Sequence, residues 1–150
     1  MVGVSCRGRG SWFLDRRAKA MMILVIDDDY LVRYTLARLL RSEGYEVITA
    51  ADGERGMSVF RSAVPDLVIT DIIMPEQEGI ETIRLMRRER PDAKIIAISG
   101  GSRLGDLDVL DIASKLGADD IVRKPFDAGD LLSRVRRLTP ASGQDGGGAA

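Results

Sequence analysis

The sequence predicts an α/β fold in which a five-stranded parallel sheet is covered by helices on both faces. Short apolar runs, several of them rich in β-branched residues, recur along the chain and are typical of strands buried on both faces. Amphipathic segments with a helical period separate these runs, so strand and helix alternate. The expected strands span residues 22–26, 46–50, 67–70, 95–99 and 121–124.

The helices are predicted from apolar residues that recur on one face. The last helix has the clearest start, because Asp127 can cap it, Asp130 stands at its third position and Phe126 can pack against Leu131. In chain order, the faces expected to be buried are Val32, Leu36, Leu39 and Leu40; Met57 and Phe60; Ile80, Ile83 and Met86; Leu107, Leu110, Ala113 and Leu116; and Leu131, Leu132, Val135 and Leu138.

The composition excludes several classes of chemistry. The 150 residues include no histidine and one cysteine, Cys6, so Ser-His-Asp triads, His-ligated zinc and disulfides within the chain are excluded. The net charge of −1 favours neither nucleic acid nor a membrane surface as a partner. Any chemistry should use carboxylates, lysine, hydroxyls or a hard metal ion. The single cysteine fits a reducing compartment, and we expect a cytoplasmic protein.

Both ends of the chain are predicted to lie outside the folded domain, which we expect over residues 21–139. Residues 1–20 are basic, contain three glycines and lack a clear period. They are expected to be a disordered extension or a start assigned too early, and an amphipathic partner-binding segment is the alternative. Residues 140–150 are rich in Gly, Ala and Ser and are expected to be a flexible tail.

Polar residues stand at the ends of four of the five predicted strands. Three aspartates at 27–29 follow the first strand, Asp71 follows the third, Ser99 ends the fourth and Lys124 ends the fifth. Because the carboxyl ends of parallel strands share one edge of the sheet, and ligands of such folds bind there, we expect these side chains to converge.

The predicted acidic cluster needs a cation. Asp27, Asp28 and Asp71 would repel one another without one. Carboxylate oxygens favour Mg²⁺, which takes one or two carboxylates together with phosphate oxygens. Lys124 adds a positive charge and Ser99 adds a hydroxyl donor, so the set can bind a phosphoryl group and stabilise its transfer. One carboxylate could itself be the nucleophile, which would give an acyl phosphate.

The stretches ILVIDDD, DLVITDIIMPEQEG, IIAISGG and IVRKPF occur in an order that resembles the receiver domain of two-component response regulators. The resemblance covers about residues 21–139 and depends on all four motifs in order, since no single motif is specific. It implies a flavodoxin-like (βα)5 fold with strand order 2-1-3-4-5. Because only a short tail follows Leu138, the chain resembles a stand-alone receiver without an output domain.

The resemblance also implies roles for the polar residues. Asp71 matches the phosphoacceptor, Lys124 matches the lysine that pairs with the phosphoryl group, and Ser99 matches the hydroxyl that moves toward it. The residues that match Mg²⁺ ligands are Asp28 directly, Asp27 largely through water, Asp71, and Ile73 through its backbone carbonyl.

Three smaller expectations concern the surroundings of this site. The Lys124–Pro125 peptide bond should be cis, as is usual in the family. Asp29 should start a helix rather than bind metal. Ile121 stands where the family often carries an aromatic residue that reorients on switching, so a shift of a loop or of the helix over 107–116 would have to replace it. The segment SGGSRLGDLDVLD is expected to be a mobile loop.

The expected partners follow from the same resemblance. Because the chain has no histidine, the phosphoryl donor must be a sensor histidine kinase, a histidine phosphotransfer protein or a small acyl phosphate. A downstream protein is expected on the face formed by the helix over 107–116, the strand over 121–124 and the last helix. The arginines at 84–90 and 134–137 are expected to be solvated, with no direct contact to nucleic acid or membrane.

Three other functions fit the sequence less well. A Mg²⁺-dependent phosphatase would carry Asp-x-Asp-x-Thr after the first strand; Asp27 and Asp29 fit that spacing, but Leu31 replaces the threonine and there is no cap domain. A flavin carrier of the same fold needs a hydroxyl-rich phosphate loop, and three aspartates would repel the flavin phosphate. A degenerate receiver that serves only for docking is disfavoured by the complete set of polar residues.

Overall fold

A parallel sheet with strand order β2-β1-β3-β4-β5 organises the chain, which confirms the predicted fold class and order. The computed structural model describes residues 20–72, 78–100, 114, 115 and 117–140, and Met21–Thr139 form one compact unit. The strands are β1 (Met22–Ile26), β2 (Glu46–Ala50), β3 (Leu67–Asp71), β4 (Ile95–Ser99) and β5 (Asp120–Arg123). The helices are α2 (Tyr30–Ser42), α3 (Gly53–Ala63), α4 (Glu78–Glu89) and α6 (Ala128–Leu138).

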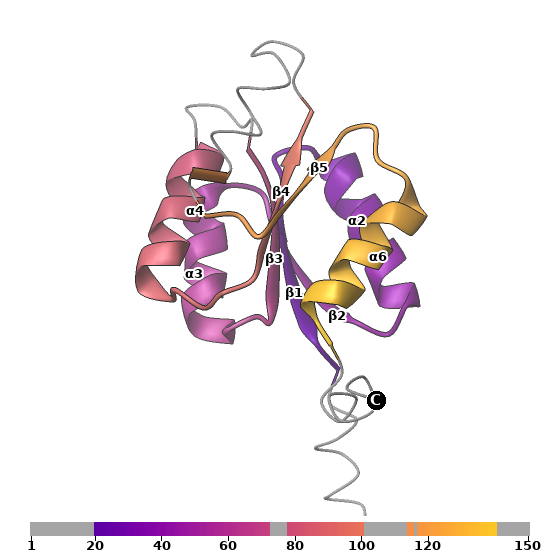
Figure 1. The fold of residues 1–150 in the computed structure, drawn as a ribbon, viewed down its shortest axis with the longest axis horizontal. Helices are drawn as coiled ribbons and strands as arrows, with labels where there is room; N and C mark the ends of the chain where they lie inside the picture. The colour runs from indigo at the N-terminus through magenta and orange to yellow at the C-terminus, as the bar shows by residue number, and fades with distance from the viewer. Residues whose placement is uncertain (1–19, 73–77, 101–113, 116, 141–150) are drawn as a thin grey trace, which may run out of the picture. The chain divides into compact units, whose positions relative to one another are not determined.

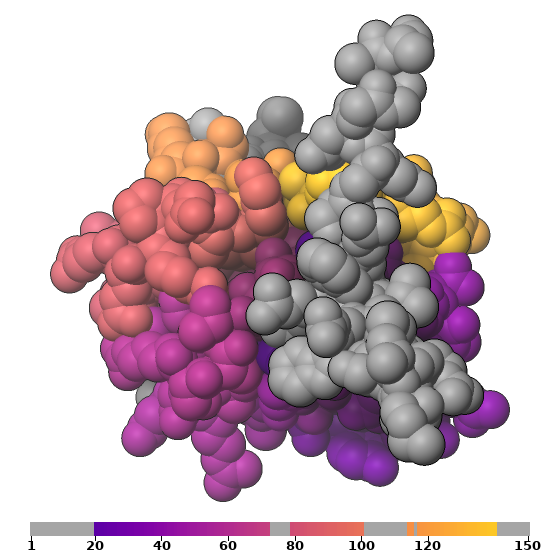
Figure 2. Space-filling model, turned by 90° about the horizontal axis from the view of Figure 1, so that it is seen from below, coloured from indigo at the N-terminus to yellow at the C-terminus, as the bar shows by residue number. Residues whose placement is uncertain are grey.

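The helices form two layers, one on each face of the sheet. In Figure 1, α3 and α4 lie on one side and α2 and α6 on the other. Figure 2, seen from below, shows the same two pairs, α3 beside α4 and α6 beside α2. Alternate residues of a strand pack into opposite layers. In β1, Leu24 and Ile26 pack toward α3 and α4, whereas Ile23 and Val25 pack toward α2 and α6.

Each layer buries the helical faces that the apolar period predicts. The α3–α4 layer contains Met57, Phe60, Ile83 and Met86, and all four side chains are at most 4% exposed. The other layer contains Leu36, Leu40, Leu131, Leu132 and Val135, while Val32, Leu39 and Leu138 are partly buried against it. Burial of each such side chain contributes about 1.5–3 kcal/mol, which makes these two layers the main source of stability.

Aspartates begin three of the helices. The side chain of Asp29 accepts a hydrogen bond from the backbone N–H of Leu31 at 2.9 Å, and that of Asp127 accepts one from Asp130 at 3.0 Å. Both caps were predicted. Asp52 caps α3 in the same way, which the sequence analysis did not anticipate. Such a cap typically stabilises a protein by about 1 kcal/mol.

Some expectations need correction or lie beyond the described residues. Strand β5 starts and ends one residue earlier than predicted, because its ladder with β4 runs from the pair of Asp120 and Ile96 to the pair of Arg123 and Ser99. Strand β3 ends one residue later than predicted, at Asp71, which pairs with Ile98. Of the helix expected over 107–116, the structure describes Ser114 and Lys115, which are helical. Most of the loop predicted before this helix lies outside the described residues, and so do the two predicted tails except for residues 20 and 140.

Helix α3 ends at the C-cap residue Val64, whose backbone lies in the left-handed region with φ of 50°. A β-branched side chain is strained there, whereas glycine is not. The side chain of Val64 is 56% exposed, so its packing does not compensate for the strain.

Replacement of Val64 by Gly is therefore expected to raise the free energy of unfolding by about 0.5–1 kcal/mol, measured by urea denaturation. Val64→Ala removes the same exposed apolar atoms but keeps a Cβ in the left-handed region, so it should give little of this gain. Equal stabilities of the Gly and Ala variants would show that the backbone at this helix end is not strained.

Candidate functional site

The register of the two central strands brings Asp27 and Asp71 together. Ile26 of β1 pairs with Thr70 of β3, so the next residue on each strand, Asp27 and Asp71, stands level at the carboxyl edge of the sheet. Both side chains are buried, with residue exposures of 1% and 4%. The strand pairing that forms the core therefore also sets two carboxylates side by side.

Lys124 binds both of these carboxylates. Its Nζ donates to Asp27 Oδ2 at 3.1 Å and to Asp71 Oδ2 at 3.2 Å. Burial alone would lower the pKa of Lys124, but the attraction of Asp71 and the hydrogen bond and charge of Asp27 outweigh it, so the pKa is raised above its ordinary value. The ammonium group is therefore charged at neutral pH and offsets part of the negative charge.

A third carboxylate completes the cluster. Asp27, Asp28 and Asp71 each offer an oxygen, and these three oxygens lie within 4.8 Å of one another. Asp28 is exposed, so the cluster is open to solvent on its side. Carboxylate oxygens from a compact set with one open side fit a hard divalent cation that keeps part of its water shell. The donor set thus suits the predicted Mg²⁺.

Asp29 does not belong to this set. Its carboxylate accepts from the backbone N–H of Leu31 and starts helix α2, as predicted. The Asp-x-Asp spacing that a phosphatase would use therefore carries one clustered residue and one helix cap.

Three hydrogen bonds, two of the backbone and one of the side chain, hold Asp27 in place. Its N–H donates to the carbonyl of Ala50 at 3.2 Å, and its Oδ1 accepts from the N–H of Asp29 at 2.9 Å. An Arg33 Nη donates to the carbonyl of Asp27 at 2.7 Å. Arg33 is not among the residues that the sequence predicted for this site. Its place one helical turn into α2, facing back toward the strand end, is the signal that could have identified it.

Ser99 and Gly100 position Lys124, through a backbone hydrogen bond and through contact with its side-chain stem. The N–H of Lys124 donates to the carbonyl of Ser99 at 2.7 Å. A Cβ added at Gly100 would lie 2.9 Å from Lys124 Cδ, so the lysine stem runs directly over this glycine. Ser99 is 7% exposed at the end of β4. The Lys124–Pro125 bond is cis, as expected.

Four of the predicted site residues, Asp27, Asp28, Asp71 and Lys124, thus come together at one edge of the sheet, and Ser99 ends the neighbouring strand. Ile73, the predicted carbonyl ligand, lies outside the described residues. The individual roles in metal binding and phosphoryl transfer stay predictions.

Comparisons with known proteins agree with this geometry. Residues 23–136 match the family described as the response regulator receiver domain. Over 116 residues the chain is 40% identical to a probable transcriptional regulator, ycf27, of Cyanophora paradoxa and 34% identical to the transcriptional regulatory protein CpxR of Escherichia coli K12. The alignments cover 77% of this chain but 47% and 48% of those proteins, so the chain spans about half the length of the curated relatives it matches.

Solved structures share the fold. A response regulator receiver domain protein from Clostridium thermocellum is 34% identical with a TM-score of 0.72, over 79% of this chain and 93% of that one. The response regulator TrrA of Thermotoga maritima, solved in complex with Mg²⁺-BeF, is 38% identical with a TM-score of 0.70, over 79% of this chain and 98% of that one.

Gly79, in the first turn of α4, packs directly on the backbone of the site. A Cβ at this position would lie 2.2 Å from the carbonyl oxygen of Asp71 and 2.6 Å from that of Ile72. Neither backbone atom can move aside without displacing the end of β3. Gly79 is not among the predicted site residues, because the sequence does not show how closely α4 packs on the end of β3.

Replacement of Gly79 by Ala is expected to destabilise the protein by about 1–3 kcal/mol, the usual range for overpacking. Gly129→Ala is the matched control, since its added Cβ would meet only the Asp127 carboxylate, at 3.1 Å, in a helix that alanine favours. Urea denaturation of both variants tests this. Equal effects of the two substitutions would mean that α4 does not pack as closely on β3 as described.

Proposed function

The chain belongs to the response regulator receiver family, and we propose that within it Asp71 accepts a phosphoryl group from a phosphohistidine on a partner protein. The observation that carries the proposal is the contact of Lys124 with Asp27 and Asp71 beside the exposed Asp28. A buried carboxylate held next to a cation, in an acidic cluster that is open on one side, suits a nucleophile for phosphorus.

Apart from a proton from solvent, the proposed transfer needs only the phosphohistidine and the carboxylate of Asp71. An oxygen of the Asp71 carboxylate attacks phosphorus, the P–N bond of the phosphohistidine breaks, and the imidazole leaves with the electron pair and takes a proton from solvent. The product is an acyl phosphate on Asp71. Because the chain contains no histidine, the donor is supplied by a sensor histidine kinase or a histidine phosphotransfer protein, and a small acyl phosphate can replace it.

Two residues bind and orient the transferred group. Lys124 is charged and already lies 3.2 Å from Asp71 Oδ2, so its ammonium can pair with a phosphoryl oxygen after a small movement. The hydroxyl of Ser99, at the end of the adjacent strand, can donate a hydrogen bond to another oxygen.

The proposed metal is Mg²⁺, held by Asp27, Asp28 and Asp71, with the carbonyl of Ile73 as the further ligand that the family resemblance implies. When bound, Mg²⁺ supplies positive charge that offsets the carboxylates and the phosphoryl oxygens. In this proposal Asp28 provides the exposed oxygen, and Asp27, whose carboxylate accepts hydrogen bonds from Lys124 and from the N–H of Asp29, acts largely through water.

The consequence of phosphorylation is a change of partner binding or onward transfer of the phosphoryl group. The proposed output face includes β5 and α6, which are described, and the helix expected over 107–116, which lies mostly outside the described residues. No helix in the described part of the chain has the length and apolar character to cross a membrane. The proposed location is the cytoplasm, where a reduced Cys6 is expected.

Treatment with acetyl phosphate and Mg²⁺ is expected to add the mass of one phosphoryl group to the wild type and none to Asp71→Asn, measured by intact-mass spectrometry. The reason is that an amide lacks the anionic oxygen that attacks phosphorus. Asp92→Asn, which changes an exposed aspartate in the turn after α4, is the matched control and should be labelled like the wild type. Labelling of the Asp71 variant would identify another nucleophile.

Mg²⁺ is expected to stabilise the wild type against urea, because a cation that binds only the folded state shifts the unfolding equilibrium. Above saturation, each tenfold rise in Mg²⁺ should add about 1.4 kcal/mol. Asp28→Asn should lose most of this response, and Asp92→Asn should keep it. The assigned ligands would be contradicted if the stability of the wild type did not change with Mg²⁺, or if the Asp28 variant responded to Mg²⁺ as strongly as the wild type.

A further inference from the structure

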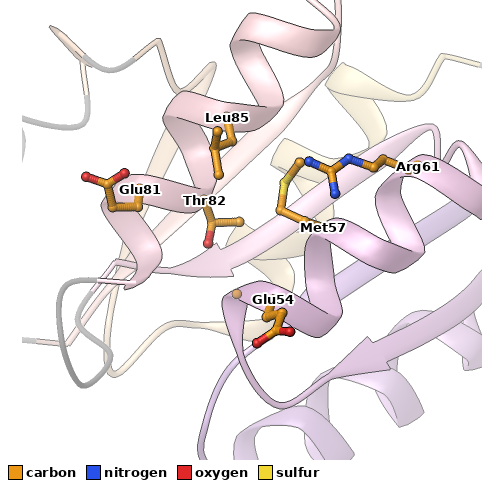
Figure 3. Close-up of a pocket in the computed structure, with 7 residues that line it drawn as sticks. Glu54, Met57, Arg61, Glu81, Thr82 and Leu85 are labelled. Atoms are coloured by element: carbon orange, nitrogen blue, oxygen red, sulfur yellow. The ribbon is translucent and has the colours of Figure 1, made fainter.

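A groove separates the outer surfaces of α3 and α4. Its volume is about 340 Å³. Glu54, Met57 and Arg61 recur at helical spacing along one face of α3, and Glu81, Thr82 and Leu85 line it from α4 (Figure 3). The two helices pack against each other beneath it, so the groove is a feature of the folded layer.

The middle of this groove is apolar. Met57 is 4% exposed and forms part of the core, and Leu85, on the opposite helix, is 36% exposed and is one of the larger exposed apolar side chains. Thr82 is 3% exposed between them. An apolar side chain from a partner would therefore contact Met57 and Leu85 and remove the latter from water.

The two ends of the groove differ in charge. Glu54 and Glu81 are exposed near the start of their helices, and no described residue forms an ion pair with either. At the other end Arg61 already binds Glu89 through two nitrogens, at 2.7 and 3.0 Å. Among the described residues, this end of the groove therefore carries two carboxylates that have no ion-pair partner.

We propose that this α3–α4 groove is a docking site for a partner segment that carries a lysine or arginine beside an apolar side chain. The cation lies at the end of the groove that carries Glu54 and Glu81, and the apolar side chain lies over Met57 and Leu85. The volume lies at the lower end of the range for small-molecule pockets, so it suits one or two side chains of a peptide better than a cofactor.

The groove is linked to the acidic cluster through α4. Gly79 rests on the carbonyl of Asp71, and Glu81, Thr82 and Leu85 follow within the next two turns of the same helix. A movement of the end of β3 therefore displaces one wall of the groove relative to α3. Resting on the proposed function, this contact makes the affinity for the partner segment depend on the state of Asp71.

The test uses two small probes, the blocked dipeptides acetyl-leucyl-lysine amide and acetyl-leucyl-glutamate amide, titrated into the ¹⁵N-labelled full chain and followed by NMR. The lysine probe is expected to shift the amide signals of Met57, Thr82 and Leu85 saturably, and the glutamate probe should not. Glu54→Gln combined with Glu81→Gln should weaken the lysine probe about fivefold, as expected for the loss of two exposed ion pairs.

The control is Glu46→Gln, which removes an exposed carboxylate from β2 and should leave binding unchanged. Equal shifts from both probes, shifts confined to other surfaces, or full affinity in the double glutamine variant would overturn the proposal. So would shifts of the same signals that depend on protein concentration without any probe, because these would assign the groove to a second copy of the chain.

A second titration is made with beryllium fluoride and Mg²⁺ present, and the affinity for the lysine probe is expected to change at least about threefold. An unchanged affinity in a chain that has bound beryllium fluoride would refute the link to Asp71. Failure of the chain to bind beryllium fluoride, with the groove still selecting the lysine probe, would instead count against the proposed function and leave the docking site supported.

Discussion

The contact of one ammonium group with two buried carboxylates is the interaction on which this site depends. Asp27 and Asp71 are both nearly inaccessible to water, and two ionised carboxylates in such a place repel each other strongly. Lys124 is the cation that the described residues bring to both. Removal of one member of such a group leaves a buried charge without its partner, which costs more than the pair contributes. The fold therefore tolerates this edge of the sheet only while positive charge remains within reach.

The apolar core fixes where those charges stand. Alternate residues of β1 pack into opposite helical layers, so a slip of one residue would exchange every side chain between the two faces. The same slip would move Asp27 out of level with Asp71. Because the core strongly disfavours the slip, the geometry of the acidic cluster follows from the burial of Ile23, Leu24 and their neighbours. The apolar packing that stabilises the fold therefore also sets the arrangement of the site.

This dependence explains which features could be predicted from sequence. The strands and the residues that end them are visible locally, since apolar runs stop at Asp27, Asp71, Ser99 and Lys124. The strand order came from the resemblance to a family, because alternation of strands and helices does not distinguish among sheet orders. Arg33, Gly79 and the cap at Asp52 were missed. Arg33 lies only six residues after Asp27, and its place in the first turn of α2 could have identified it. The contact of Gly79 depends on how closely α4 packs on the end of β3, which no pattern in the sequence records.

The site contacts the two helical layers in different ways. This difference determines which helix would be displaced first by a change at Asp71. Asp27 is tied to α2 through hydrogen bonds with Asp29 and Arg33, which can lengthen or exchange with water. Asp71 meets α4 through backbone packed on Gly79, which has no side chain that could yield. In the proposed reaction, an acyl phosphate on Asp71 would add negative charge and would compete with Asp27 for Lys124. Because the hard contact is the one to α4, a displacement of the end of β3 must move that helix before it moves α2.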